Sequence, residues 1–213
     1  TLEDFVPSSL VQFETEIFAV TEEGLTSIQA QLGLGNTGED GAASVGINTS
    51  FAIGNYALSV ALAGARTTNQ LKRVSTVKQI LPNVSKLEFE DVTPVWFSPT
   101  TGRAEMLESG LKIKGEVSIS RSNAKRITIQ DFQFYYGIER PQIGPSDPLR
   151  VKTLKFKLEE LNLHEGLSNM MVSTNNFEMG RSLSIGFPTD LNWHRKNTKL
   201  VIITRAKAFS FED

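Results

Sequence analysis

Residues 41–65 form a stretch of 25 residues without a single charged side chain. Its apolar residues fall first on odd positions and then on even positions, and the change occurs at Gly54-Asn55. A two-residue loop with glycine in its first central position suits a type II′ turn. Because strand side chains alternate between faces, folding the chain at this dipeptide brings the apolar side chains onto one face. The pattern therefore predicts a β-hairpin over residues 44–65.

The apolar face of this predicted hairpin carries Val45, Ile47, Phe51, Ile53, Tyr56, Leu58, Val60 and Leu62. The opposite face carries only small residues, as in a strand pair that is covered on both sides within a buried sheet. Each arm is also ten residues long, which is enough for a membrane-spanning strand. The hairpin thus has two interpretations, the centre of a sandwich or a membrane-inserting element. A single transmembrane helix is disfavoured because glycine and asparagine interrupt the stretch.

Alternation of apolar and polar residues predicts strands along most of the remaining chain. The expected strands are 10–20, 87–97, 111–119, 126–136, 151–163, 183–187 and 199–211. A short helix is expected to start at Thr21-Glu22-Glu23 and to end at Gly33, and helical spacing is also found over 71–81 before Pro82. The polar segment 167–181 is expected to be a loop or a short helix.

These elements predict an all-β, mainly antiparallel fold, a β-sandwich or jelly-roll-like domain with two or three short helices. The 213 residues are expected to form one domain over 1–213, and the proline-containing loop 137–148 is the candidate boundary if the chain is divided. Within the strand over 126–136, the apolar positions change parity around Gln130-Asp131. This change indicates a β-bulge.

Charge is segregated along the chain although the net charge is only −2. Residues 1–40 hold eight acidic residues and no basic one, whereas residues 41–87 hold five basic residues and no acidic one. Such blocks attract one another, either within one chain or between neighbouring copies. The predicted assembly contacts are Glu14, Glu16, Glu22 and Glu23 on one side and Arg66, Lys72, Arg73 and Lys78 on the other.

Residues capable of catalysis or of binding a cofactor show no recognisable arrangement. The absence of cysteine excludes disulfides and thiol catalysis, and the two histidines, His164 and His194, have no partner at metal-ligand spacing. Residues 33–38 match G-x-G-x-x-G, but a helix precedes them and Glu39-Asp40 follow, which is the wrong context for binding phosphate. We therefore expect no enzyme activity, no metal and no cofactor.

The leading functional hypothesis is a non-enzymatic structural protein that assembles with copies of itself, such as a viral coat, shell or lattice subunit in a virion or outside the cell. The chain starts at Thr1 without methionine, so we expect it to be a processed product or a fragment, and any signal or N-terminal arm would lie outside this sequence. Nucleic acid would bind only through a basic face or through such an arm.

Two alternatives remain open. One is a membrane-inserting or pore-forming protein that uses residues 44–65. The other is a carbohydrate-binding module with Trp96, Tyr135, Tyr136 or Trp193 as stacking platforms.

Overall fold

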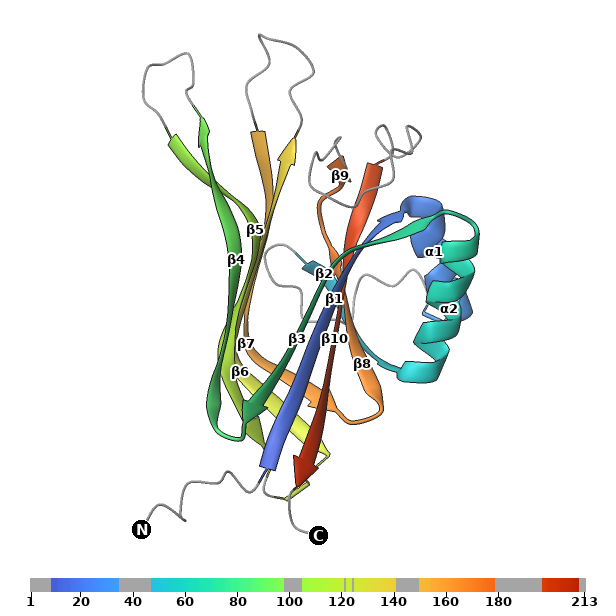
Figure 1. Cartoon of the computed structure of the whole chain (residues 1–213). Coiled ribbons are helices and arrows are strands. Elements are labelled where there is room, and N and C mark those ends of the chain that lie inside the picture. The colour runs from blue at the N-terminus through green and yellow to red at the C-terminus, as the bar shows by residue number, and fades with distance from the viewer. Residues whose placement is uncertain are drawn as a thin grey trace.

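The computed structural model describes residues 9–34, 47–97, 105–120, 122–123, 125–140, 150–178 and 197–210. These residues form two antiparallel sheets and two helices (Figure 1). The all-β, mainly antiparallel, sandwich-like fold with short helices is thus confirmed. The elements in chain order are β1 (Ser9–Thr21), α1 (Glu22–Gln31), β2 (Ile47–Gly54), α2 (Asn55–Thr67), β3 (Leu71–Pro82), β4 (Ser85–Phe97), β5 (Glu105–Ile119), β6 (Arg126–Arg140), β7 (Arg150–His164), β8 (Leu167–Ser173), β9 (Phe177–Glu178) and β10 (Asn197–Ser210).

The first sheet, called sheet A here, has the strand order β2-β8-β10-β1-β3, with the short β9 also paired to β10. The second, sheet B, is the meander β4-β5-β6-β7. The chain passes from sheet A to sheet B at the tight turn between β3 and β4, and it returns at the turn between β7 and β8. Figure 1 shows both turns at the lower end of the molecule, with the upper parts of β4–β7 extending away from sheet A.

Sheet A is the middle layer, because both of its faces are covered by apolar packing. One face meets sheet B in a core that includes Phe13, Ile17, Phe134 and Phe156. The other face packs under α1 and α2 through a second cluster that includes Leu58. Burial of such side chains supplies the main driving force for folding, at roughly 1.5–3 kcal/mol for each large apolar side chain.

The predicted hairpin over 44–65 is wrong in its second half, because Asn55–Thr67 is the helix α2. Leu58, Ala61 and Ala65 are its buried residues, at helical spacing, whereas Tyr56 and Val60 are exposed. The apolar residues at even positions follow the alternation of a strand, but only over the four positions 56, 58, 60 and 62. The alanines between them favour a helix once one side can pack on sheet A.

The first half of that prediction is a strand, but its apolar residues do not share one face. Ile47 packs in the core between the two sheets, whereas Ile53 and Phe51 pack under the helices. A register shift in the β2–β8 pairing between Ile47 and Thr49 causes this change. Val45 lies outside the described residues.

Two further predictions are corrected. Residues 71–81 form strand β3 rather than a helix, because their pairing with β1 overrides the helical spacing. Much of 167–181 is also strand, since β8 pairs with both β2 and β10. Residues 183–187 and His194 lie outside the described residues.

The bulge predicted at Gln130-Asp131 is present. Lys114 pairs with Gln133 and Glu116 with Gln130, so β6 has one more residue than β5 in this interval. Asp131 adopts a positive φ of 49°. On the opposite strand, a Cβ at Gly115 would overlap the side chain of Ile129, so only glycine fits beside the bulge.

Candidate functional site

The two edge strands of sheet B are the candidate interaction site. β4 and β7 are each paired on one side only within the described residues. They are 13 and 15 residues long, and such long unpaired edges can add a further strand. Because sheet B has four antiparallel strands, β4 and β7 run in opposite directions. An added β7 would therefore be antiparallel to β4, as in the rest of the sheet.

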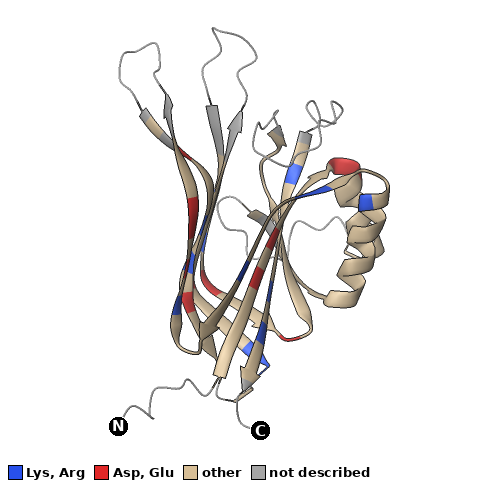
Figure 2. Cartoon of the chain, in the orientation of Figure 1, with Lys and Arg blue, Asp and Glu red and all other residues tan. Residues whose placement is uncertain are grey.

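Alternation sets which side chains of the two edges face outward. Leu87 on β4 and Leu154 and Phe156 on β7 are buried toward sheet A. The residues that alternate with these buried ones along each strand therefore point their side chains to the open face of sheet B and are exposed. They are Lys86, Glu88 and Glu90 on β4 and Lys155, Lys157 and Glu159 on β7. Figure 2 shows charged residues along sheet B, in contrast to α2, where Arg66 is the only one.

Ion pairs on this open face link neighbouring strands. The Lys114 Nζ lies 2.9 Å from Glu88 Oε1, and the Lys112 Nζ lies 3.1 Å from Glu90 Oε1 and 2.8 Å from Glu108 Oε2. The hydrogen bond from Lys114 lowers the pKa of Glu88, and the same contact raises the pKa of Lys114. This exposed face is highly charged, so it is unsuited to contact with lipid acyl chains.

Lys157 on the β7 edge pairs with Asp131 of the bulge, with Nζ and Oδ1 2.8 Å apart. This hydrogen bond raises the pKa of Lys157. Lys155 lies opposite Tyr135 of β6. The two edges thus differ in the sign of their charge, since β4 presents Glu88 and Glu90 and β7 presents Lys155 and Lys157.

The predicted assembly contacts lie mainly on sheet A and the helices. Glu14 lies opposite Lys78 in the β1–β3 pairing, and Glu16 Oε1 lies 3.4 Å from Arg73 Nη1. The acidic and basic blocks therefore meet within one chain at β1 and β3. Glu22 and Glu23 lie in the first turn of α1, Arg66 in the last turn of α2, and Lys72 on β3. Their role between copies stays a prediction.

Glu16 is the centre of a partly buried polar network. Its Oε2 accepts a hydrogen bond from Arg205 Nη1 at 2.9 Å, and the Arg205 Nε donates to Ser168 Oγ at 2.8 Å. The Ser168 hydroxyl in turn donates to Asn55 Oδ1 at 2.6 Å. These contacts join β1, β10 and β8 to the first residue of α2. The network therefore stabilises the fold by holding the helix layer to sheet A.

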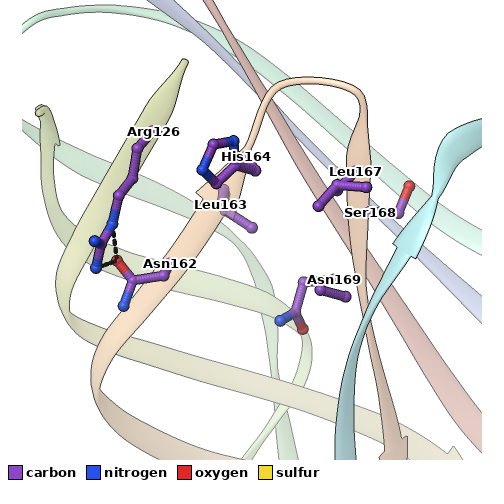
Figure 3. Close-up of a pocket in the computed structure, with 8 residues that line it drawn as sticks. Arg126, Asn162, Leu163, His164, Leu167, Ser168 and Asn169 are labelled. Carbon is purple, nitrogen blue, oxygen red and sulfur yellow. Dashed lines mark hydrogen bonds between the residues drawn. The ribbon is translucent and has the colours of Figure 1, made fainter. Parts of the chain in front are cut away.

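A hollow of about 270 Å³ lies where β7 turns into β8 (Figure 3). His164, Asn162 and Arg126 line one side of it, and Asn169 lines the other. The Arg126 Nη2 donates to Asn162 Oδ1 at 3.0 Å and lies 3.7 Å from Glu160 Oε1. Because Glu160 lies beside this guanidinium and offsets its charge, the hollow offers little attraction for an anion. No group of three or more metal-ligating side chains occurs among the described residues.

The aromatic residues proposed as sugar platforms are poorly placed for stacking. Tyr136 packs against the core between the sheets, and burial raises its pKa to about 12. The Tyr135 hydroxyl donates to the carbonyl oxygen of Glu108 at 2.7 Å, and the Lys112 ammonium lies 5.9 Å from its ring centre. Trp193 and the side chain of Trp96 lie outside what the structure describes.

The charged residues of the two edges were visible in the sequence only as the polar side of predicted strands. Nothing in one dimension shows that β4 and β7 lie at opposite edges of one sheet. Across the described ranges, neither helix combines the length and apolar character needed to cross a bilayer.

No protein-family model matches the sequence, and no curated protein matches it. Among solved structures, the type II secretin GspD from enteropathogenic Escherichia coli is similar, with 12% identity, a TM-score of 0.47, and coverage of 98% of this chain and 71% of that one. An enterotoxigenic E. coli (ETEC) pilotin–secretin AspS–GspD complex is similar with 11% identity and a TM-score of 0.45, and the match covers 99% of this chain and 52% of that one. The Vibrio cholerae type IV competence pilus secretin PilQ is similar with 14% identity and a TM-score of 0.39, and the match covers 97% of this chain and 63% of that one. These structures are secretins, and the viral coat subunit that the sequence suggested has no counterpart among them.

Proposed function

We propose that this chain is a non-enzymatic structural subunit of a closed homo-oligomeric ring, in which the sheets B of neighbouring copies join edge to edge into a continuous channel wall. The observation that carries the proposal is the pair of open, antiparallel and oppositely charged edges at β4 and β7. Such a contact joins two different surfaces, so repetition closes into a ring when the rotation allows it.

Strand number supports sheet B over sheet A as the shared wall. Four strands per copy keep every neighbour antiparallel around the ring. The path of sheet A has five strands, so its edges β2 and β3 run in the same direction. A β3–β2 contact between copies would be parallel, unlike every other pair in the sheet.

The proposal keeps the self-assembly predicted from the sequence and replaces the pore-forming hairpin as the working part. A ring of this kind would belong with secretin-like assemblies. The distant likeness in fold adds no weight to this proposal, which stands on the geometry and charge of the two edges.

The test is the mass of the purified chain by light scattering, together with negative-stain images, across a salt series. We expect rings whose mass falls at high salt, because charged edges attract less strongly when screened. The double substitution Glu88→Lys with Glu90→Lys should weaken assembly about tenfold or more, since it places like charges at the contact. A chain that stays monomeric at all salt and protein concentrations would overturn the proposal.

The matched control is Glu22→Lys with Glu23→Lys on α1, which makes the same change in net charge away from both edges. This control should assemble normally. If it blocks assembly while the β4 variant does not, the contacts predicted from the charge blocks are correct and the edge contact is wrong.

A further inference from the structure

The direction in which backbone groups point along β4 and β7 determines which residues can pair across a shared edge. The Gln79 Nε2 donates to the carbonyl oxygen of Glu88 at 3.2 Å, so this carbonyl points away from β5. In an antiparallel ladder, alternate residues point their N–H and C=O groups to opposite sides. The backbone N–H and C=O groups of even-numbered residues of β4 near Glu88 therefore point to the open edge.

Pro94 gives independent support for this assignment. Proline has no N–H to donate and is tolerated in sheets where that group would face an open edge. Position 94 belongs to the same even-numbered set as Glu88. The β4–β5 ladder therefore loses no hydrogen bond at Pro94.

The same alternation can be followed across the sheet to β7. Glu88 pairs with Lys114, Lys114 with Gln133, and Gln133 with Lys157. If the backbone N–H and C=O of Glu88 point to the open edge of β4, those of Lys114 point to β6 and those of Gln133 point back to β5. The backbone groups of Lys157 then point to the open edge of β7. Glu88 and Lys157 can therefore form a hydrogen-bonded pair between two copies, in which the Glu88 carbonyl oxygen accepts from the Lys157 N–H in addition to Gln79 Nε2, since a carbonyl oxygen has two lone pairs.

We propose that β7 of one copy pairs with β4 of the next in the register that places Lys157 opposite Glu88. This proposal deepens the proposed function and rests on it, since it assigns the contact that would join the ring. The register places Lys155 opposite Glu90 and Glu159 opposite Lys86 on the open face. On the inner face, it places Phe156 opposite Phe89 and Leu158 opposite Leu87.

All three outward pairs in this register have opposite charge, and both inward pairs are apolar. Shifting the strands by two residues, the smallest change that keeps the faces, loses this match in either direction. One shift puts Lys157 opposite Lys86, and the other puts Glu159 opposite Glu88. Like charges directly opposite one another destabilise a sheet, so the side chains favour one register over its neighbours.

A polar atom beside the β4 edge is also without a partner. The Gln79 Oε1 is buried and accepts no hydrogen bond within the described ranges, although the Nε2 of the same amide contacts Glu88. A strand added along β4 brings N–H donors to this place. Occupation of the edge would thus lower the cost of a buried, unsatisfied acceptor.

Disulfide cross-linking tests the register directly, because the natural chain contains no cysteine. The register places Thr153 opposite Val92 as an outward, hydrogen-bonded pair. The Cα atoms of such a pair lie about 5.5 Å apart, which is within the range that a disulfide spans. The variant Val92→Cys with Thr153→Cys should give a ladder of covalent oligomers after oxidation.

The matched control is Val92→Cys with Lys157→Cys, which moves one cysteine four residues along the same edge. It should cross-link at least about tenfold less, because the two sites then lie beyond disulfide reach. Mixing the single variants Val92→Cys and Thr153→Cys should give a covalent dimer that neither gives alone, and circular dichroism checks that each variant folds.

The outcomes separate the two proposals. Rings that form under reducing conditions but cross-link equally in the control would overturn the register and leave the ring intact. Cross-linking of Val92→Cys with itself would show a symmetric β4–β4 contact and overturn the register. A chain that is monomeric in every variant and in the natural sequence would overturn both.

Discussion

The two sheets of this protein bury their side chains in different ways. Sheet A is covered on both faces, by sheet B and by the helices, and the charged residue that it buries among the described residues, Glu16, is held in a network with two arginines. Sheet B is covered on one face, and its other face consists largely of exposed lysine and glutamate pairs. The comparison suggests that the two sheets have different roles: sheet A forms the core of the subunit, and sheet B offers a surface for contact with neighbouring copies.

The place where Gly110 of β5 meets Gly137 of β6 should be the most sensitive in the fold. Gly110 has a φ of +125° and lies opposite Gly137, and a Cβ at Gly110 would overlap the carbonyl oxygen of Asp91. We expect Gly110→Ala to lower the free energy of unfolding by about 3 kcal/mol or more, because strain and overlap act together.

Urea denaturation of the chain at concentrations where it is monomeric measures this effect. Gly54→Ala is the control, since Gly54 has a φ of −57° and open space around it. Equal stability for the two alanine variants would mean that the strands do not approach as closely as the structure shows.

The second prediction compares one carboxylate from each sheet. The side chain of Glu16 is only 11% exposed and pairs with Arg205, whereas that of Glu88 is 62% exposed. Glu16→Gln should cost about 2 kcal/mol of unfolding free energy, because it removes a charge-assisted hydrogen bond from a largely buried arginine contact. Glu88→Gln should leave the stability of the monomer unchanged within error. A larger loss for the Glu88 variant would contradict the division between the sheets.

The third and smallest effect concerns pH. Burial raises the pKa of Tyr136 to about 12, from about 10 in an unfolded chain. The folded state therefore keeps this proton where the unfolded state loses it, so stability is fully present below about pH 10 and falls as the pH rises toward 12.

Tyr136→Phe should flatten this alkaline decline, measured as the midpoint of thermal unfolding at pH 9 and pH 11. Tyr56→Phe is the control, since Tyr56 lies on α2 and is 84% exposed. An unchanged slope in the Tyr136 variant would show that its hydroxyl is not withheld from water.

Much of the fold could be predicted from hydrophobic periodicity and, for the helix, from its capping residues. The strands over residues 10–20, 111–119 and 151–163 and the helix after Thr21 all appear where the pattern placed them, because each has a long run with one period. The prediction failed at 55–65 and 71–81, where short runs satisfied both a strand and a helix period. Tertiary packing decided those segments: α2 packs over sheet A, and β3 pairs with β1.

The candidate site was less accessible to sequence reasoning. Lys155 and Lys157 look like any solvated strand face until the order β4-β5-β6-β7 is known. The charge blocks at the start of the chain were the stronger signal in one dimension, yet Glu16 and Arg73 meet within a single chain. Strand order and edge position depend on long-range pairing, and that information is not contained in local periodicity.

Pro94 has a consequence for the shape of a ring. A shared ladder can continue upward along β4 only as far as the residues that offer an N–H, and it loses a donor at this proline. In the proposed register Pro94 would lie opposite Val151 of the next copy, so the shared ladder would lose one hydrogen bond there. Pairing between copies should therefore be weakest toward the upper ends of β4 and β7.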